Sequence, residues 1–412
     1  MRRSPSRFSR AIWAIALAVG CQGTRPLPDG GLPAVGPLGG KLVTTNQGDG
    51  TLSVIEPASG RFDGPILVPI VDAQNMEMAH EISADPAGRF FVVGLMEMPA
   101  TDRAALGTAS EIAMMNSTIP GWVLELSAAD GSLVGKAQVD PDPGDNGLSA
   151  DGSVIYVSCF NQPEVIAAEG QGDTNLRDLD GHLWAIDSAT LQPLATLSVC
   201  PEPHVIELSA DGRTLFVTCL NDEIAVVDVS DPRSPALRAR VSEDRGPDGG
   251  SVEVLPSEAV HGPYALQASP ASPDGGETVW VSDALAPALE VLDAQSLSFV
   301  KTLPMTGLPV FTTFNAAGTR AYNAHQQPDG IAVFDAIART QIDDIPLAAP
   351  DCVGARQLVL SADETKGYVL CEGDHVSGGQ YVILDLAART VVSSTTIGID
   401  PVEMSLIPLP PP

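Results

Sequence analysis

The sequence predicts an all-β fold: a single seven-bladed β-propeller with four-stranded antiparallel blades, closed by pairing of the C-terminal strand with the N-terminal blade. Two observations predict it. A turn-and-strand phrase recurs along the chain, and the strands around it sort into six whole units and two halves. The composition agrees, because aromatic residues make up only 5% while Gly and Pro number 39 and 35, as expected of many short strands and turns.

The repeated phrase is a tight turn of the Ser-Ala-Asp-Gly type followed by an alternating, Val-rich strand. LSADGRTLFVT begins at Leu208, and a second apolar strand, IAVVD, follows from Ile224. The last intervals between such turns are near the usual length of a propeller blade, and the earlier ones are longer, which predicts insertions in the earlier blades. The turns are centred on Asp85, Asp151, Asp211, Asp274 and Asp363, and Asn315-Ala316-Ala317-Gly318 keeps the turn without the acid.

The first unit lacks an inner strand, and the other end of the chain supplies one. A strand pair begins at Lys41, and a lone strand follows Pro401. Pairing these two halves would remove the sheet edge that an open array leaves exposed. An open solenoid is the alternative, and the split first blade argues against it. The predicted blades are residues 41–70 plus 401–408, 78–140, 145–199, 203–242, 262–304, 308–347 and 352–398.

LSADGRTLFVT with IAVVDV, and LSADGSVIYVS from Leu148, resemble the YVTN-type β-propeller repeat family of bacterial surface and periplasmic proteins, a relative of the propeller lactonases. The resemblance covers about residues 41–408 and implies the fold and a cell-envelope setting. It says little about activity, because propellers host many chemistries. No catalytic set can be carried over from the lactonases, so no catalytic residue is predicted and a non-enzymatic role is favoured.

The N-terminal residues 1–21 have the features of a lipoprotein signal peptide: a basic start, a short apolar run and Ala18-Val19-Gly20-Cys21, which resembles a bacterial lipobox. Cys21 would carry the lipid, with ordinary signal cleavage as the alternative. By analogy with Gram-negative lipoproteins, Gln22 suggests the outer membrane. Residues 22–40 form a Pro- and Gly-rich tether, and residues 409–412 a Pro-rich tail. The membrane would then be reached only through the lipid anchor.

The charge limits the class of partner. A net charge of −30 repels a phosphate backbone, which excludes nucleic acid as a partner. The expected partner is a small molecule or another envelope protein, and the expected assembly is a monomer.

One face of the propeller is predicted to be the ligand face, because the long insertions and all six histidines map to its loops between second and third strands and between blades. The insertions are residues 95–121, 161–181 and 243–262. Insertions also accumulate wherever loops are tolerated, which is the alternative reading. The candidate ligand-face residues are His80, His204, His261, His325 and His375, with His182 near them.

A cluster of soft ligands on this face makes copper the candidate cofactor. Thioether and imidazole groups suit Cu(I), and Met-x-Met spacing on an extended chain points both sulfurs the same way. The favoured alternative is a short lid helix between Met98 and Met115 whose methionines only pack. The candidate ligands are Met76, Met78, His80, Met96, Met98 and His204.

Three functions therefore stay open: a binding module, a metal- or redox-linked propeller, and a lactonase-like hydrolase. In the second, copper binds at the Met and His cluster or the protein partners a haem protein. His80 and His204 could also hold copper, zinc or a haem edge, but no C-x-x-C-H occurs, so covalent c-type haem is excluded. Two acidic segments, Asp140–Asn146 and Asp173–Gly181, place hard oxygen ligands close together, which would allow weak calcium sites in an exported protein. Neither has EF-hand spacing, so solvated loops are the favoured expectation.

Cysteine spacing predicts two disulfides. Cys200 and Cys352 each lie nine residues before the serine of an LSAD turn, and Cys219 and Cys371 each lie ten after it. Equivalent pairs in two separate blades, in an exported chain, predict the bridges Cys200–Cys219 and Cys352–Cys371 between the first two strands of each blade. Cys159 occupies the same slot as Cys219, but Asp140 stands where its partner would be, so it should be a thiol or a competitor for Cys200.

Overall fold

The computed structural model describes residues 36–68, 75–99, 118–160, 162–172, 175, 179–244, 254–270 and 276–410. The predicted signal peptide, Cys21 and most of the tether lie outside these residues, as does most of the proposed lid helix. For Met76 and Met98 only the backbone is described.

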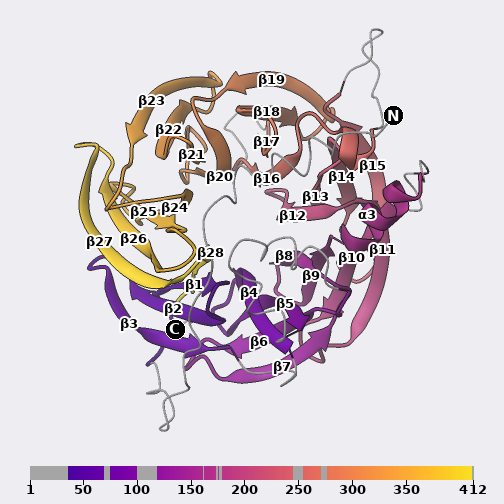
Figure 1. Cartoon of the computed structure of the whole chain (residues 1–412), viewed down its shortest axis with the longest axis horizontal. Helices are drawn as coiled ribbons and strands as arrows, with labels where there is room; N and C mark the ends of the chain where they lie inside the picture. Colours follow the sequence, from indigo (N-terminus) through magenta and orange to yellow (C-terminus); the bar gives the residue numbers. More distant parts are fainter. Residues whose placement is uncertain are drawn as a thin grey trace. The chain divides into compact units, whose positions relative to one another are not determined.

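Seven four-stranded antiparallel sheets make up the protein, which confirms the seven-bladed β-propeller (Figure 1). The chain divides into two compact units. The described part of the first, here the middle unit, runs over Ser158–Ala185 and Leu194–Pro346, and that of the second, here the terminal unit, over residues 36–157, 186–193 and 347–410.

Three sheets lie wholly in the terminal unit. Their strands are β28 (Pro401–Leu406), β1 (Leu42–Asn46), β2 (Thr51–Glu56) and β3 (Arg61–Leu67); β4 (Asn75–Ala84), β5 (Phe90–Pro99), β6 (Trp122–Ser127) and β7 (Leu133–Gln138); and β24 (Ala355–Leu360), β25 (Lys366–Cys371), β26 (Gly378–Asp385) and β27 (Thr390–Ile399).

Three more sheets lie in the middle unit, each again in chain order from inner to outer strand. They are β12 (Pro203–Leu208), β13 (Thr214–Cys219), β14 (Glu223–Asp228) and β15 (Ala236–Ser242); β16 (Pro263–Ala268), β17 (Thr278–Asp283), β18 (Ala288–Asp293) and β19 (Ser298–Pro304); and β20 (Leu308–Phe314), β21 (Arg320–Gln326), β22 (Gly330–Asp335) and β23 (Thr340–Pro346).

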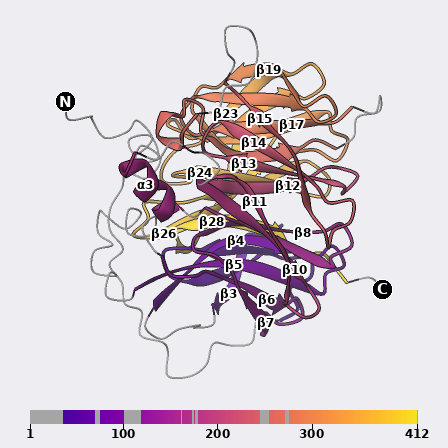
Figure 2. The ribbon, with the colours of Figure 1, turned by 90° about the vertical axis from the view of Figure 1, so that its right-hand side faces the viewer.

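The remaining sheet has the order β11-β10-β9-β8, with β8 (Pro143–Leu148), β9 (Val154–Cys159), β10 (Asp180–Asp187) and β11 (Pro193–Pro201). A short helix, α3 (Gln162–Gly170), follows β9, and a 3-10 turn, η3 (Pro256–Glu258), precedes β16. In Figure 2, α3 lies outside the sheet formed by β12 to β15.

The C-terminal strand completes the first sheet, as predicted. β28 pairs antiparallel with β1, with Leu42 opposite Leu406 and Val43 opposite Ser405. Without β28, the edge of β1 would present unpaired amide and carbonyl groups.

The repeated turn owes its sequence to hydrogen bonds made by its serine. Ser209 Oγ accepts the Thr214 amide at 3.0 Å and donates to Asp211 at 2.7 Å, and Gly212 takes a left-handed φ of 67°. The turn that lacks the acid keeps the same pattern, because the side chain of Asn315 accepts the Arg320 amide at 2.8 Å.

The core sits between neighbouring sheets, which is why strands near the start of each blade read as continuous apolar runs. β13 is buried along nearly its whole length, whereas the outer strand β15 alternates between exposed and partly buried residues. In the middle unit, Phe216, Val226 and Val281 belong to one apolar cluster that joins two sheets. The sheets are thus rigid supports for the loops at their ends.

Both predicted disulfides are present, but their position differs from the prediction. Cys200–Cys219 and Cys352–Cys371 each span 19 residues. The residue opposite Cys219 in the strand ladder is Pro203, and Cys200 lies earlier, in β11. Each bridge therefore ties the segment that enters a blade to that blade's second strand. Cys159 lies outside both bridges and is buried.

The first acidic segment is not a solvated loop. Asp142 and Asp145 are 4% and 7% exposed, because residues 143–148 form the inner strand β8. The strand starts before the predicted blade boundary at residue 145. Burial raises the pKa of Asp142 to about 7. In the second segment, Asp180 is also buried and pairs with Arg240 at 2.5 Å.

Candidate functional site

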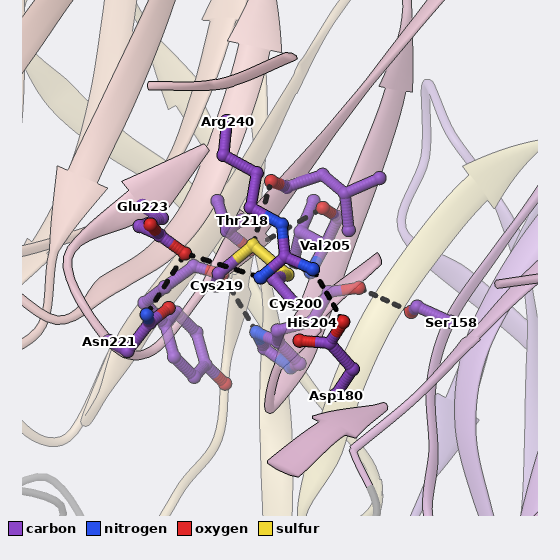
Figure 3. Close-up of a disulfide and its surroundings, with 12 residues drawn as sticks. Ser158, Asp180, Cys200, His204, Val205, Thr218, Cys219, Asn221, Glu223 and Arg240 are labelled. Carbon is purple, nitrogen blue, oxygen red and sulfur yellow. Dashed lines mark hydrogen bonds and ion pairs between the residues drawn. A yellow bond between two sulfur atoms is a disulfide. The ribbon is translucent and has the colours of Figure 1, made fainter. Parts of the chain in front are cut away.

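A three-residue loop between β13 and β14 anchors the second insertion of the middle unit, residues 243–262. Asn221 Nδ2 donates to the Val254 carbonyl at 3.3 Å, inside the insertion, and to Glu223 at 3.0 Å. Glu223 lies 3.7 Å from Arg240, beside the Cys200–Cys219 bridge (Figure 3). The loop is therefore held by its own sheet while it holds the insertion.

Asp222 fixes the end of that insertion. Its two carboxylate oxygens accept backbone amides of three consecutive residues: Val260 at 2.6 Å, His261 at 2.9 Å and Gly262 at 2.6 Å. Charge-assisted bonds of this kind are among the stronger ones in proteins. They determine where the backbone of His261 lies.

The His261 side chain lies among carboxylates from two sheets and their connection. Its Nδ1 is 3.3 Å from Oδ2 of Asp283, at the end of β17, and 3.9 Å from Oε2 of Glu243, which follows β15. Its Nε2 is 3.8 Å from Oδ1 of Asp244. Ligand atoms of Glu243, His261 and Asp283 all lie within 4.8 Å of one another. These three residues are called the His261 centre below.

The centre is buried on one side and open on the other. The side chains of Glu243 and Asp283 are 1% and 0% exposed, whereas those of His261 and Asp244 are 25% and 24% exposed. Neither side-chain oxygen of Glu243 has a hydrogen-bond partner among the described residues. A buried carboxylate without a donor is costly unless a cation or a proton neutralises it.

The pKa values of the centre reflect this excess of negative charge. A hydrogen bond to Asp283 raises the pKa of His261 to about 9. Burial, reinforced by the neighbouring Asp283, raises the pKa of Glu243, and burial raises the pKa of Asp283 to about 7. Without another cation, the centre must hold protons to be neutral. One imidazole and two carboxylates are also a ligand set for a divalent metal ion such as Zn²⁺ or Mn²⁺.

The two insertions of the middle unit pack against each other beside this centre. Val165 of α3 and Leu255 belong to one small apolar cluster, and the Ser257 amide donates to Glu169 of α3 at 3.1 Å. Together with Asn221 and Asp222, these contacts hold the second insertion at both of its described ends.

The other predicted histidines make structural contacts. His204 of β12 donates from Nδ1 to the Tyr264 carbonyl at 2.7 Å and stacks on Phe160. Both ring nitrogens of His325 are engaged, with Pro328 at 2.8 Å and Asp344 at 3.0 Å.

In the terminal unit, His375 pairs with Asp400 at 2.8 Å, and Nδ1 of His80 is 3.1 Å from the Gly144 carbonyl oxygen. His80 lies on β4 of the terminal unit and His204 on β12 of the middle unit.

The methionine cluster is described only in part. In the β4–β5 ladder Met78 is opposite Met96, so these two side chains share one face, and the backbone of Met76 is opposite that of Met98. Met78 and Met96 are 3% and 7% exposed. Copper binding by this set stays a prediction.

Sequence reasoning found His261 but not its acidic partners. Asp283 carries a signal that could have found it: it stands opposite Pro263, the slot that Cys219 fills opposite Pro203. An acid in a slot where other blades place a buried cysteine is a departure from the repeat. Glu243 carries no such signal, because it is one of many acids in an acidic chain.

Comparisons with known proteins support the fold. No family model matches the chain, and no curated protein matches it. The structure of the Pseudomonas aeruginosa periplasmic gluconolactonase PpgL is similar, with a TM-score of 0.59 at 16% identity, covering 89% of this chain and 98% of that one.

The dihydro-heme d1 dehydrogenase NirN is also similar, with a TM-score of 0.55 at 13% identity, covering 93% of this chain and 79% of that chain. Kuenenia stuttgartiensis hydrazine synthase gives 0.53 at 14% identity, covering 92% and 99%. At these identities the likeness concerns the fold alone: this is a β-propeller whose structural neighbours include a gluconolactonase, a dihydro-heme d1 dehydrogenase and a hydrazine synthase.

Two observations bear on the compartment. The pair of disulfides indicates an oxidising environment outside the cytosol. Among the described residues, no helix has the length and apolarity to cross a bilayer.

Proposed function

We propose that this protein is an exported, lipid-anchored propeller that binds a divalent metal ion of the zinc or manganese class at the His261 centre. Glu243, His261 and Asp283 are its ligands. The observation that carries the proposal is Glu243, a carboxylate buried to 1% exposure with no hydrogen-bond partner among the described residues, within 4.8 Å of an imidazole and a second buried carboxylate.

Three protein ligands leave coordination positions for water or for the ligand that the loops would hold. The exposed edges of His261 and Asp244 mark the open side. The proposal thus combines the predicted binding module with the predicted metal-linked propeller. It differs from the sequence-based prediction in placing the metal at the His261 centre, whose carboxylate and imidazole ligands are harder than the thioethers of the methionines.

Metal binding must compete with protons at this centre. His261 has to lose its proton to coordinate, and Glu243 and Asp283 have raised pKa values, so each metal ion displaces protons. The affinity should therefore rise as pH rises from about 6 to about 9 and weaken in acid.

The test is isothermal titration of the mature chain, residues 22–412, with Zn²⁺ and Mn²⁺ after removal of metal by chelation. One site should be occupied per chain, and Glu243→Gln and His261→Ala should each weaken it at least about tenfold, roughly 1.4 kcal/mol. His325→Ala is the matched control, because this buried histidine lies in the same unit with both nitrogens engaged by protein. Equal affinity in wild type and both centre variants would reject the proposal.

Lactone hydrolysis is a second candidate, favoured by the likeness to the periplasmic gluconolactonase PpgL together with the open side of the centre. A metal ion held by Glu243, His261 and Asp283 would supply Lewis-acid activation of water, and the Asp244 carboxylate would orient that water toward a lactone carbonyl, whose ring oxygen would leave as the hydroxyl of the acid. Gluconolactone opening that is abolished by a chelator and by His261→Ala would support it. If gluconolactone opens no faster than it does in buffer alone, lactone hydrolysis is rejected and the metal-binding proposal remains.

A further inference from the structure

Three acids, two buried and one partly buried, converge on inner strands of the terminal unit, and none of them belongs to the His261 centre. They are Glu81 on β4, Asp145 on β8 and Glu403 on β28. Ligand oxygens of the three lie within 4.8 Å of one another. Figure 1 shows the three strands β28, β4 and β8 in succession.

The fold does not require acids at these positions. In the strand ladders Ala79 is opposite Leu95, as Pro203 is opposite Cys219 and Ala355 opposite Cys371, and Glu81 follows two residues after Ala79. The position equivalent to Glu81 is occupied in the other sheets by Val205, Ala265, Phe311 and Gln357. The acids are thus a departure confined to three neighbouring inner strands.

Glu81 is the residue that most clearly lacks a protein counter-charge. It is 1% exposed, and neither of its side-chain oxygens accepts a hydrogen bond from any described residue outside the three acids. His80 Nδ1 lies 3.2 Å from Oε1, but that nitrogen is also 3.1 Å from the Gly144 carbonyl oxygen, with which it is hydrogen bonded.

The other two acids are held in place by backbone amides. Ile82 donates to Glu403 at 2.7 Å, and Asn146 donates to Asp145 at 2.6 Å. Arg356, the nearby guanidinium, donates to Glu372 at 2.6 Å and to the Val402 carbonyl at 2.5 Å. Burial raises the pKa of Glu81 and Glu403 and outweighs the lowering effect of the Arg356 charge, so both pKa values stay raised. The three carboxylates therefore form a fixed, oxygen-only set with excess negative charge.

We propose that Glu81, Asp145 and Glu403 form a second cation site, distinct from the His261 centre, that takes a hard divalent ion, namely Ca²⁺. Carboxylate oxygens without imidazole or thiolate favour calcium over zinc or copper. Glu403 is only partly buried, so the ion can enter on its side. Because the ion would join the inner strands of three sheets, it stabilises the terminal unit when bound.

The experiment is calcium titration of the metal-free mature chain by calorimetry, together with thermal unfolding in calcium and in a chelator. Wild type should bind one Ca²⁺ and unfold at a higher temperature in calcium. Glu81→Gln and Glu403→Gln, which keep shape and remove charge, should each weaken calcium binding about tenfold or more. His261→Ala should bind calcium as wild type does, and Glu81→Gln should bind Zn²⁺ or Mn²⁺ as wild type does.

These controls test the two proposals separately. If the zinc or manganese site is rejected, the calcium site can still be confirmed by its own variants. The alternative is that Glu81 and Glu403 only share a proton. In that case calcium gives no heat and no thermal shift, and Glu81→Gln unfolds at the same or a higher temperature in both buffers. That result would overturn the inference.

Discussion

Single residues in this protein have two kinds of role. Some close the turns of the repeat, and others hold segments that lie outside it. Ser209 and Asn315 close equivalent turns by the same hydrogen bonds, so the turn tolerates a change of residue that keeps an acceptor. Asp222 instead holds three backbone amides of an insertion. Residues of this second kind are the ones that lead to the candidate site.

Replacement of Asp222 by Asn should weaken metal binding while lowering the stability of the fold only modestly. An amide side chain loses the charge and one acceptor oxygen, which costs about 2 kcal/mol for the buried bonds to residues 260–262. We expect weaker Zn²⁺ or Mn²⁺ binding together with a modest loss of stability, measured by calorimetry and urea unfolding. Asp231→Asn, at an exposed turn, is the control. Unchanged metal affinity in Asp222→Asn would contradict its positioning role.

Glu202 should give the folded protein a measurable pH dependence. Burial raises its pKa to about 8, from an ordinary value of 4.5. The folded chain therefore keeps a proton that the unfolded chain loses, so Glu202 makes stability fall as pH rises from about 4.5 to about 8. The substitution Glu202→Gln should remove this pH dependence of stability. The variant should exceed the wild type in stability by the largest amount near pH 8.

The measurement for Glu202 is the melting temperature of wild type and variant from pH 4 to pH 9. Glu164→Gln, on the exposed side of α3, is the control and should follow the wild type. Parallel curves for wild type and Glu202→Gln would show that the buried carboxyl does not titrate as described.

At the scale of elements, one insertion is held in place by a loop of the neighbouring sheet. The segment between β15 and β16 is tied at Val254 by Asn221 and at residues 260–262 by Asp222. Its sequence is irregular, and nothing in its own residues reveals these contacts. The contacts come from a neighbouring loop that is far away in sequence order, which is why His261 was predicted without Glu243 and Asp283.

The disulfides were predictable as pairs because equal spacing recurs in two blades. Their placement was not, because the first cysteine lies outside the inner strand, where the chain passes from one sheet to the next. Similarly, Asp142 and Asp145 were expected in solvent because an acidic, Pro-rich stretch is typical of loops. Here packing between sheets outweighed that local preference.

Loss of one bridge should destabilise the chain without abolishing the fold. Cross-linking a loop of this length stabilises by about 3 kcal/mol in the chain-entropy description. Cys352→Ala with Cys371→Ala should lower the free energy of unfolding by that order, measured in urea. Cys159→Ala, the control, keeps both bridges. Peptide mapping without reductant should recover Cys159 as a thiol, and a bridge from Cys159 to Cys200 would contradict the assignment.

At the scale of the whole molecule, the fold was predictable almost completely. The count of seven blades and the closure by the last strand follow from a repeat that is visible in the sequence, and both are confirmed. The candidate sites were not predictable from the sequence, because they form where side chains from different sheets meet. Glu81 and Glu403, for example, are 322 residues apart in the chain (403−81), and the repeat alone does not show that their side chains meet.

Closure by β28 should be essential for cooperative folding. A chain ending at Asp400 lacks the strand that pairs with β1 and leaves that edge open, so it should aggregate or unfold without a sharp transition. A chain ending at Pro410 keeps β28 and should melt like the wild type. Calorimetric scans of the two truncations decide the matter, and equal transitions would show that the last strand is dispensable.

The most direct test of the central claim is anomalous X-ray diffraction from crystals of the mature chain soaked in Mn²⁺ or Zn²⁺. The account predicts an anomalous peak within coordination distance of Glu243, His261 and Asp283, and its loss in Glu243→Gln crystals treated in the same way. A peak at Met78 and Met96 with none at His261, or no peak at any of these residues, would contradict it.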